Sequence, residues 1–281
     1  MKKNKKYYIS QALLITFMAI LCFLWMVPLV YMFLTSFRPN DDINLNGFVL
    51  FPKVITFDNY ISLFKNTQSA PVGKWLLNSL IVSLSSSLLT VLISSLSAFA
   101  YARMRFKGNK LLFSFLLLTM MIPSVISLIP NFLTIKGMHL NETLLALILP
   151  FLGGVANIFL IRQFLYGVPK ELDEAALIDG AGYGKLFFRI ILPQMVPILM
   201  VVGINTFLAA WNDLLWPLII NQDAANRTMT SGLSVVQGIF DDEKGTLMAV
   251  TVVSAVPVLV VYLFVQKYLI RGISLTSGMK E

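Results

Sequence analysis

Long runs of residues without a single charge constrain this chain more than any other feature of its sequence. One of them extends from Tyr7 to Phe37. About 20 consecutive apolar residues are enough to cross the hydrocarbon core of a bilayer as a helix, and the core of a soluble protein does not need runs of this length. Only 13% of the 281 residues are charged, about half of the usual share in a soluble globular chain. The sequence therefore predicts a polytopic membrane protein.

Six apolar segments are long enough to cross a bilayer as helices, some of them with a tilt or a kink. They cover residues 9–34, 75–101, 111–133, 144–165, 195–220 and 246–270. The first is longer than the apolar region of a signal peptide, roughly 7–15 residues, and no small-x-small cleavage site follows it, so we interpret it as a retained span. The expected fold class is all-α, with six transmembrane helices.

Three of these spans have unusual interiors. Seven serines lie between residues 83 and 97 of the second span, and they predict that one of its faces packs closely against another helix. The third and fifth spans contain prolines, which kink membrane helices and free backbone carbonyl groups. These prolines are Pro123, Pro130, Pro197 and Pro217.

The distribution of lysine and arginine predicts the orientation of the spans, because cytoplasmic flanks are enriched in both residues. With the N-terminus inside, fifteen of the 22 basic residues lie on the cytoplasmic side, including Lys2, Lys3 and Lys280. Six spans then place both termini in the cytoplasm. The net charge of +8 is thus explained by topology, and it gives no reason to expect a nucleic-acid partner.

The connector between the fourth and fifth spans, residues 166–194, is expected to hold structure of its own, because connectors this long are uncommon without it. The segment 168–171 predicts the start of a helix, because it has a proline, Pro169, in the expected first turn and acids follow it. Gly180 is expected to end that helix. A second helical segment, 183–191, is expected to end at Leu192-Pro193. Together they predict a compact cytoplasmic protrusion.

This protrusion has the composition of a docking element. Ala175 and Ala176 are small enough to let a helix sit in a groove of a partner, and the apolar residues Leu172, Leu177 and Ile178 offer contact area. Acidic side chains are expected to pair with arginines of that partner, and they are Glu171, Asp173, Glu174 and Asp179.

The connector resembles the EAA signature of ABC importer permeases, whose pattern is Glu-Ala-Ala, three residues, Gly, nine residues, Ile, one residue, Leu-Pro. Every fixed position matches, at Glu174, Ala175, Ala176, Gly180, Ile190, Leu192 and Pro193. In addition, residues 207–218 and the tail from residue 266 resemble the carbohydrate importers of the maltose-transporter type. The chain is similar to the smaller of their two membrane subunits, the maltose-G-type permease.

The resemblance implies a type I ABC importer transmembrane fold in a bacterial or archaeal cell membrane. Residues 1–71 would form the first span and an extracytoplasmic segment, residues 72–270 the transmembrane core with the coupling loop 166–194, and residues 271–281 a cytoplasmic tail. The implied partners are a second, maltose-F-type permease, a cytoplasmic ATPase dimer, a solute-binding protein, a sugar and membrane lipid. Glu174 would pair with a basic residue of the ATPase, and Gly180 would make the turn between the helical segments.

Polar residues inside the spans are candidates for the substrate pathway. Asp213 is the only acid within a proposed span, and such residues are functional candidates by default. Its position near Trp216 nevertheless favours a structural role at a helix end over a place at the outer mouth of the sugar path. Sugars are held by stacking and amide contacts, which Trp211 and Asn212 could supply. Asn157 and Asn205 lie deeper and either join helices or line the pathway.

Other functions fit the sequence less well. Residues 180–186 lack the first glycine and the final serine or threonine of a phosphate-binding loop, so the chain is not expected to be an ATPase. The sequence contains no catalytic cluster that would predict another enzyme. One cysteine, Cys22, and one histidine, His139, leave no basis for a disulfide framework or a histidine-based metal site, and no cofactor is expected. The alternatives are a permease for glycerol phosphate or another polar solute, and an ion-coupled secondary transporter.

Overall fold

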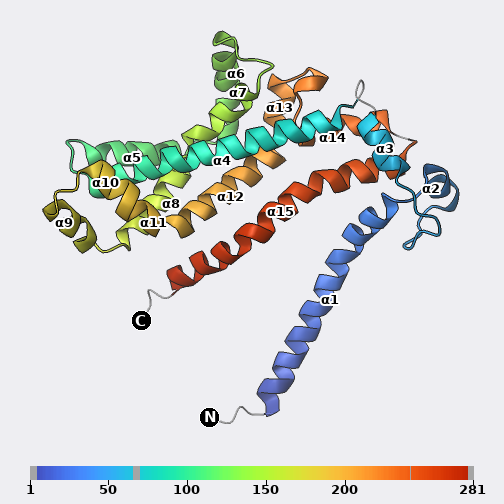
Figure 1. Cartoon of the computed structure of the whole chain (residues 1–281), viewed down its shortest axis with the longest axis horizontal. Coiled ribbons are helices and arrows are strands. Elements are labelled where there is room, and N and C mark those ends of the chain that lie inside the picture. The colour runs from blue at the N-terminus through green and yellow to red at the C-terminus, as the bar shows by residue number, and fades with distance from the viewer. Residues whose placement is uncertain (1–4, 66–69, 241, 278–281) are drawn as a thin grey trace. The chain divides into compact units, whose positions relative to one another are not determined.

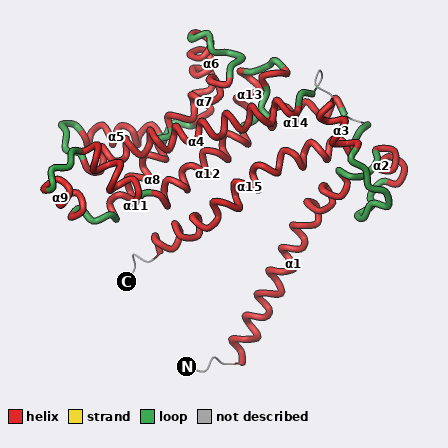
Figure 2. Tube along the Cα trace, in the orientation of Figure 1, coloured by secondary structure: helices red, strands yellow, loops and turns green. Residues whose placement is uncertain are grey.

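The structure of the chain is a computed structural model that describes residues 5–65, 70–240 and 242–277, with side chains left undescribed at 5–9, 237 and 267–277. Lys2, Lys3 and Lys280, and the end of the predicted tail, lie outside the described residues. Throughout the described part the regular structure is helical (Figures 1 and 2). The chain packs as two units, Met1–Val72 with Leu233–Ala255, and Gly73–Gly232 with Val256–Glu281.

The first unit holds the long apolar helix α1 (Lys5–Thr35), the short helices α2 (Asn40–Asn46) and α3 (Asp58–Lys65), and the first part of α15 (Lys244–Ser277). Arg38 is fully buried and forms an ion pair with Asp42 at 2.7 Å. Asn59 donates hydrogen bonds to the carbonyls of Ser36 and Arg38, both at 2.8 Å. These contacts fold the segment after the first span against itself.

Gly245 joins the start of α15 to this segment. Its N–H donates to the side-chain oxygen of Asn40 at 2.7 Å. A Cβ at this position would lie 2.6 Å from Nδ2 of Asn59 and 2.9 Å from the carbonyl of Arg38. Only glycine allows the backbone to approach this closely.

The second unit is built along two antiparallel helices, α4 (Val72–Arg103) and α12 (Val196–Asn212) (Figure 1). The hydroxyl of Ser87 on α4 donates to the carbonyl of Gly203 on α12 at 2.7 Å. Ser83, Ser86 and Ser94 are buried on α4 as well. The prediction that the serine face of the second span packs against another helix is confirmed.

The third and fourth predicted spans are broken. The third consists of α5 (Asn109–Thr119), a 3₁₀ turn η1 (Ser124–Ser127) and α6 (Leu128–Gly137), with a bend of 92°. The fourth consists of α7 (Leu144–Ile148), η2 (Leu149–Gly153) and α8 (Val155–Tyr166), with a bend of 44°. The bend expected in the third span from its prolines is thus a complete break of the helix, whereas the break in the fourth span, 144–165, was not predicted.

The fifth predicted span, 195–220, is also divided, into α12 and α13 (Leu215–Ile220). The four prolines of the third and fifth spans begin helical segments rather than kink continuous ones: Pro123 precedes η1, and Pro130, Pro197 and Pro217 lie in first turns. Proline is tolerated there because the first N–H groups of a helix have no partner within it.

Within the described residues, three helices are long and apolar enough to cross a membrane on their own, namely those covering Ser10–Thr35, Val72–Arg103 and Lys244–Gln266. Three bent pairs raise the number to six if each pair is one span: α5 with η1 and α6, α7 and η2 with α8, and the segment Tyr183–Gln194 with α12. This matches the number predicted from the sequence, although the fifth span ends at Asn212 rather than at residue 220.

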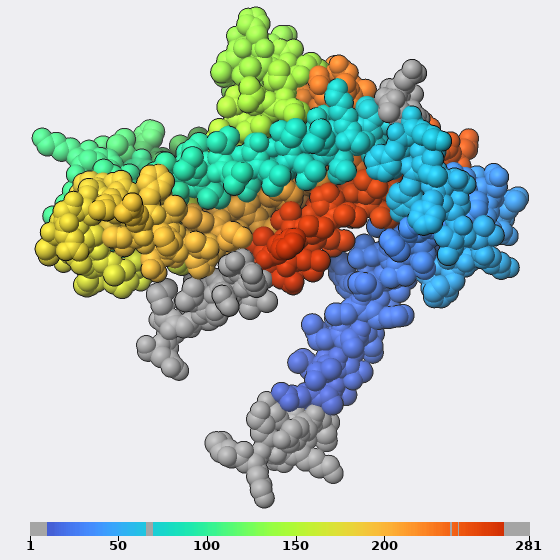
Figure 3. All heavy atoms as spheres, in the orientation of Figure 1, coloured from blue at the N-terminus to red at the C-terminus, as the bar shows by residue number. Residues whose placement is uncertain are grey.

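The second unit has apolar clusters at both ends of α12. Near its start, buried residues of α4, α8 and α12 pack with those of the connector 166–194, among them Phe99, Leu165 and Ile191. Near its end, Ala210 and Trp216 pack with α7 and with Ile135 of α6. The connector is the yellow region in Figure 3. Because α12 has 17 residues, it is about 26 Å long and carries one cluster at each end.

Candidate coupling loop and transport pathway

The connector 166–194 folds into two helical segments, as predicted. The first is α9 (Glu171–Ile178), with three acids in its first turn. Negative charges there interact favourably with the positive end of the helix dipole. Gly180 follows with φ +78°. Its N–H donates to the carbonyl of Leu177 at 3.1 Å, and the N–H of Ala181 donates to the carbonyl of Ala176 at 2.9 Å. These two bonds form a Schellman motif, in which glycine is preferred because of the positive φ.

The second segment runs from Tyr183 to Gln194 through α10 (Tyr183–Leu186), a π-helical turn η3 (Phe187–Ile191) and α11 (Leu192–Gln194). The expectation that it ends at Leu192-Pro193 was wrong by one to two residues. Proline has no N–H to donate, and the N–H of Leu192 before it reaches back to the carbonyl of Phe187. The π turn thus precedes the proline, and the sharp bend of 78° follows only before α12.

The EAA residues divide into those that pack inside the chain and those that face outward. Ala176 is 6% exposed and belongs to the apolar cluster at the start of α12, with Ile190 and Leu192 packed against it. Ala175 is exposed, as are Leu177 and Ile178, the latter at 86%. The small side chain of Ala176 thus lets α9 pack closely on its own chain, while Ala175 is the alanine of the pair that is open to a partner.

The acidic residues of α9 also have different roles. Asp173 forms an ion pair with Arg103 at the end of α4, with 3.1 Å between Oδ2 and Nε, and their side chains are 13% and 2% exposed. Arg103 also donates to the carbonyl of Val168 at 2.7 Å. The prediction that Asp173 pairs with a partner's arginine is thus corrected, because its partner lies in this chain. Glu171, Glu174 and Asp179 are exposed.

Burial governs the protonation of Asp173. It raises the pKa of this carboxyl above its ordinary value, while the positive charge of Arg103 acts in the opposite direction. Removing a carboxylate from water disfavours its charged form, and a nearby cation compensates for only part of that cost. The pair therefore ties α9 to α4 at the expense of desolvating both groups.

The predicted pathway residues do not converge on one place. Trp211 is 2% exposed and its ring stacks on Phe207, with 5.8 Å between ring centroids. It packs the core of this chain and offers no open face for a sugar ring. Asn205 and Asn212 are exposed on α12, and Asn157 is half-buried on α8.

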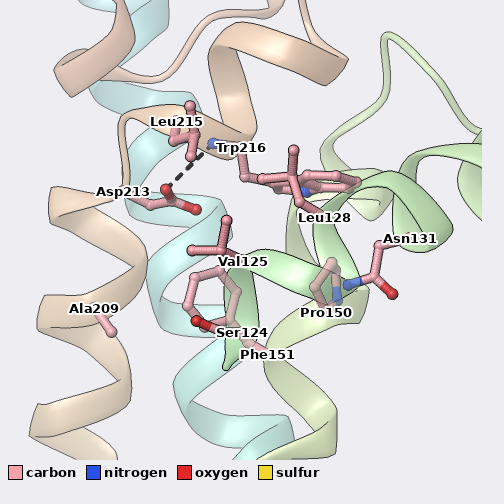
Figure 4. Close-up of a pocket in the computed structure, with 10 residues that line it drawn as sticks. All are labelled: Ser124, Val125, Leu128, Asn131, Pro150, Phe151, Ala209, Asp213, Leu215 and Trp216. Carbon is pink, nitrogen blue, oxygen red and sulfur yellow. Dashed lines mark hydrogen bonds between the residues drawn. The ribbon is translucent and has the colours of Figure 1, made fainter. Parts of the chain in front are cut away.

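Asp213 lies at the break between α12 and α13. Its carboxylate accepts a hydrogen bond from the N–H of Trp216 at 3.4 Å and so caps the start of α13. It also borders an open hollow of about 370 Å³ (Figure 4). Ser124, Asn131 and Phe151, from η1, α6 and η2, line the same hollow. Both interpretations of Asp213, as a structural group and as part of a cavity lining, are therefore compatible with its position.

The chain matches proteins of known type along its whole length. A family described as binding-protein-dependent transport system inner membrane component matches residues 90–275. The chain belongs to this family. An arabinooligosaccharide transport system permease, AraQ of Halalkalibacterium halodurans, is 34% identical over all of both chains. A galactooligosaccharide permease, GanQ of Bacillus subtilis, is 32% identical over 95% of this chain and 93% of its own.

The fold is that of an ABC importer's membrane subunit. A chain of a bacterial ABC transporter involved in the import of the acidic polysaccharide alginate superposes with a TM-score of 0.83 at 19% identity, covering 95% of this chain and 99% of that one. The chain is accordingly a multi-pass membrane permease and a transport protein rather than an enzyme.

Several residues important for this permease were missed from the sequence. Arg103 was not singled out, although it forms the ion pair with Asp173 of α9. Ser124, Asn131 and Phe151 were not singled out, although they meet Asp213 across three broken helices. The Gly-Gly pair at 153–154, just after Phe151, was the available signal of a helix break there; nothing local indicated that it would lie beside Asp213.

Proposed function

We propose that this permease is one of two membrane subunits of an ABC importer that takes up an oligosaccharide and is driven by a separate cytoplasmic ATPase. The exposed face of α9 is the observation that supports it most directly. The whole-length likeness to permeases named for arabinooligosaccharides and galactooligosaccharides supports the substrate class. The remaining predicted partners, a second permease and an extracytoplasmic solute-binding protein, fit a family named for dependence on binding proteins.

The exposed face of α9 suits docking in a groove of the ATPase. Glu171, Glu174, Ala175 and Ile178 follow one another at the i, i+3, i+4, i+7 spacing of a single helix face, and all four are exposed. Ile178 would contribute apolar contact area, and Glu174 would pair with a basic residue of the groove. Asp179, also exposed, would extend the negative charge at the end of the helix.

The other side of α9 suits force transmission. Ala176 packs into the cluster formed with α4, α8 and α12, while Arg103 pairs with Asp173. A displacement of α9 by the ATPase would therefore be passed to the starts and ends of those helices rather than be absorbed by a flexible loop. In this arrangement the loop and both termini face the cytoplasm, and the break at Asp213 lies toward the opposite side, with Asn205 and Asn212 on the pathway.

Affinity purification of the tagged chain from its native membranes tests this proposal. Ile178→Asp and Glu174→Lys should leave the second permease bound and reduce the recovery of the ATPase. Burying an isoleucine contributes about 2 kcal/mol, so the Ile178 variant should bind the ATPase roughly 30-fold more weakly. Asp41→Lys is the matched control, because Asp41 is an exposed acid in the first turn of α2 in the other unit.

Equal recovery of the ATPase with Ile178→Asp, Glu174→Lys and the control would refute docking through α9. Recovery of the chain without any ATPase, together with uptake driven by an ion gradient alone, would instead favour a secondary transporter. If the complex forms but imports glycerol phosphate and no oligosaccharide, the substrate class is wrong while the coupling site stands.

A further inference from the structure

We infer that the hollow beside Asp213 is a substrate subsite that accepts a neutral, hydroxyl-rich sugar and rejects anions such as uronic acids and sugar phosphates. This inference rests on the proposed function, and it adds the chemical class of the substrate and the residues of this chain that select it. The hollow lies entirely within the second unit.

Broken helices surround the hollow. Ser124 begins η1 after the break that follows α5, Phe151 lies in η2 just before the break at Gly154, and Asp213 lies in the gap between α12 and α13. In a bilayer, non-helical backbone is tolerated only where it is buried in protein or lines a water-filled cavity. Three helix breaks around one hollow therefore indicate a solute site, and discontinuous helices form such sites in other transporters.

The lining has the mixed character of a sugar site. Its volume of about 370 Å³ falls within the usual range of small-molecule sites, roughly 300–1,000 Å³. The ring of Phe151 and the apolar side chain of Leu128 offer surfaces for the face of a sugar ring. The hydroxyl of Ser124 and the amide of Asn131 can each donate and accept hydrogen bonds, which matches the paired donor and acceptor character of sugar hydroxyls.

The electrostatics of the hollow favour hydrogen-bond donors and oppose anions. Among the described residues that line it, Asp213 is the one with an ionisable side chain, and no lysine, arginine or histidine accompanies it. One carboxylate oxygen bonds the N–H of Trp216, and the other faces the hollow (Figure 4). The C-terminal end of α12, where Ala209 lines the hollow, adds the partial negative charge of a helix end.

The N-termini of α6 and α13 also border the hollow and must be weighed against this, because Leu128 and Leu215, their first residues, both line it. The N–H of Leu128 is already bonded to the carbonyl of Val125, and the N–H of Trp216 in the first turn of α13 is bonded to Asp213 itself. A helix terminus carries about half an elementary charge, whereas the carboxylate of Asp213 carries a whole one. The negative group therefore dominates, and a phosphate or uronate would meet net repulsion.

Charged thiol reagents can measure this potential without knowledge of the substrate. Cys22 is the one cysteine and is exposed, so Cys22→Ser provides the background in the assembled transporter. Ser124→Cys is then labelled with a cationic and an anionic methanethiosulfonate, each rate being normalised to that with a free thiol. Ser127→Cys is the matched control, because Ser127 lies in the same 3₁₀ turn but does not line the hollow.

The cationic reagent should react on the order of tenfold faster than the anionic one at Ser124→Cys. Adding Asp213→Asn should bring this ratio close to that of the Ser127→Cys control. An unchanged ratio would overturn the electrostatic selection. Failure of Ser124→Cys to react with either reagent, in any nucleotide state, would also overturn the inference, because the hollow would then be closed to solutes.

Protection from labelling tests the substrate itself. Whichever arabino- or galactotrisaccharide the transporter imports should slow the labelling of Ser124→Cys at least fivefold, whereas glycerol 3-phosphate and an alginate trisaccharide should not. Import of a trisaccharide without protection would refute the subsite but leave the proposed function intact. If no oligosaccharide is imported, the proposed function fails, and the ratio of labelling rates still decides whether the hollow repels anions.

Discussion

Replacing Arg103 with methionine should loosen α9 from the rest of the permease. Methionine keeps much of the apolar stem but removes the ion pair with Asp173 and the hydrogen bond to the carbonyl of Val168. Removing one partner of a fully buried pair costs about 3–5 kcal/mol. Asp173 retains 13% exposure, and water can solvate part of its charge, so we expect a smaller cost of about 2 kcal/mol.

Limited proteolysis with trypsin measures this cost locally. Lys170 and Lys185 flank α9 and are both exposed, but cleavage requires the backbone around them to open. When opening is fast relative to cleavage, the cleavage rate follows the population of the open form, so a cost of about 2 kcal/mol corresponds to roughly 30-fold faster cleavage. The double variant Arg103→Met with Asp173→Leu leaves no unpaired buried charge and should restore most of the resistance.

The same variant should respond to pH in a predictable direction. Burial already raises the pKa of Asp173, and loss of Arg103 removes the charge that opposes this rise. A carboxyl with a raised pKa in the folded state favours folding at pH values below its folded pKa and loses that contribution as pH rises through it. The Tm deficit of Arg103→Met should therefore shrink on acidification from neutral pH. Unaltered cleavage at Lys170 and Lys185, together with a deficit that does not vary with pH, would refute the reasoning.

Two glycine substitutions test backbone requirements elsewhere. Gly180→Ala should cost about 1–2 kcal/mol through the positive φ alone, since no atom lies within 4 Å of the added Cβ; Gly180→Asn should cost less, and equal tryptic cleavage in both variants would contradict this explanation. Gly232→Ala would place a Cβ 2.2 Å from the buried ring of Trp75 and should lower stability by about 1–3 kcal/mol. A Tm equal to that of the unmodified permease would show that α14 (Met229–Ile239) shifts without cost.

The parts of this structure that depend on local sequence could be predicted. The apolar runs indicated the spans. The acids before residue 175 and Gly180 after the helix indicated the bounds of α9, because the residues that start and end a helix lie within its first and last turns. The serine face of the second span was predicted correctly for the same reason. Its small side chains repeat at helical spacing, and such a face allows another helix to pack closely against it.

The parts that depend on distant residues could not be predicted. Nothing near Asp173 shows that its partner is Arg103, 70 positions earlier. The sequence alone therefore provides no way to distinguish this buried carboxylate from the exposed one of Glu174. Trp211 was a candidate for stacking on a sugar because sugars are held by stacking contacts, yet the fold turns its ring toward Phe207. Proline inside an apolar run is ambiguous as well, since it can kink one helix or begin another; around Pro123 and Pro217 it begins another.

The position of α12 links the two candidate sites. Its start packs in the cluster that also holds Ala176 of α9, and its last residue, Asn212, is followed directly by Asp213 at the hollow. A helix is stiff along its axis, so a displacement at the start of α12, the end that would face the ATPase under the proposed function, would reach the hollow about 26 Å away. The break after Asn212 then lets α13 keep its own packing, in which Trp216 donates to the carbonyl of Ala146 at 2.9 Å. Under the proposed function, ATP-driven movement of α9 would thus change the distance between Asp213 on one wall of the hollow and Phe151 on the other, which is the change a transporter needs in order to release its substrate.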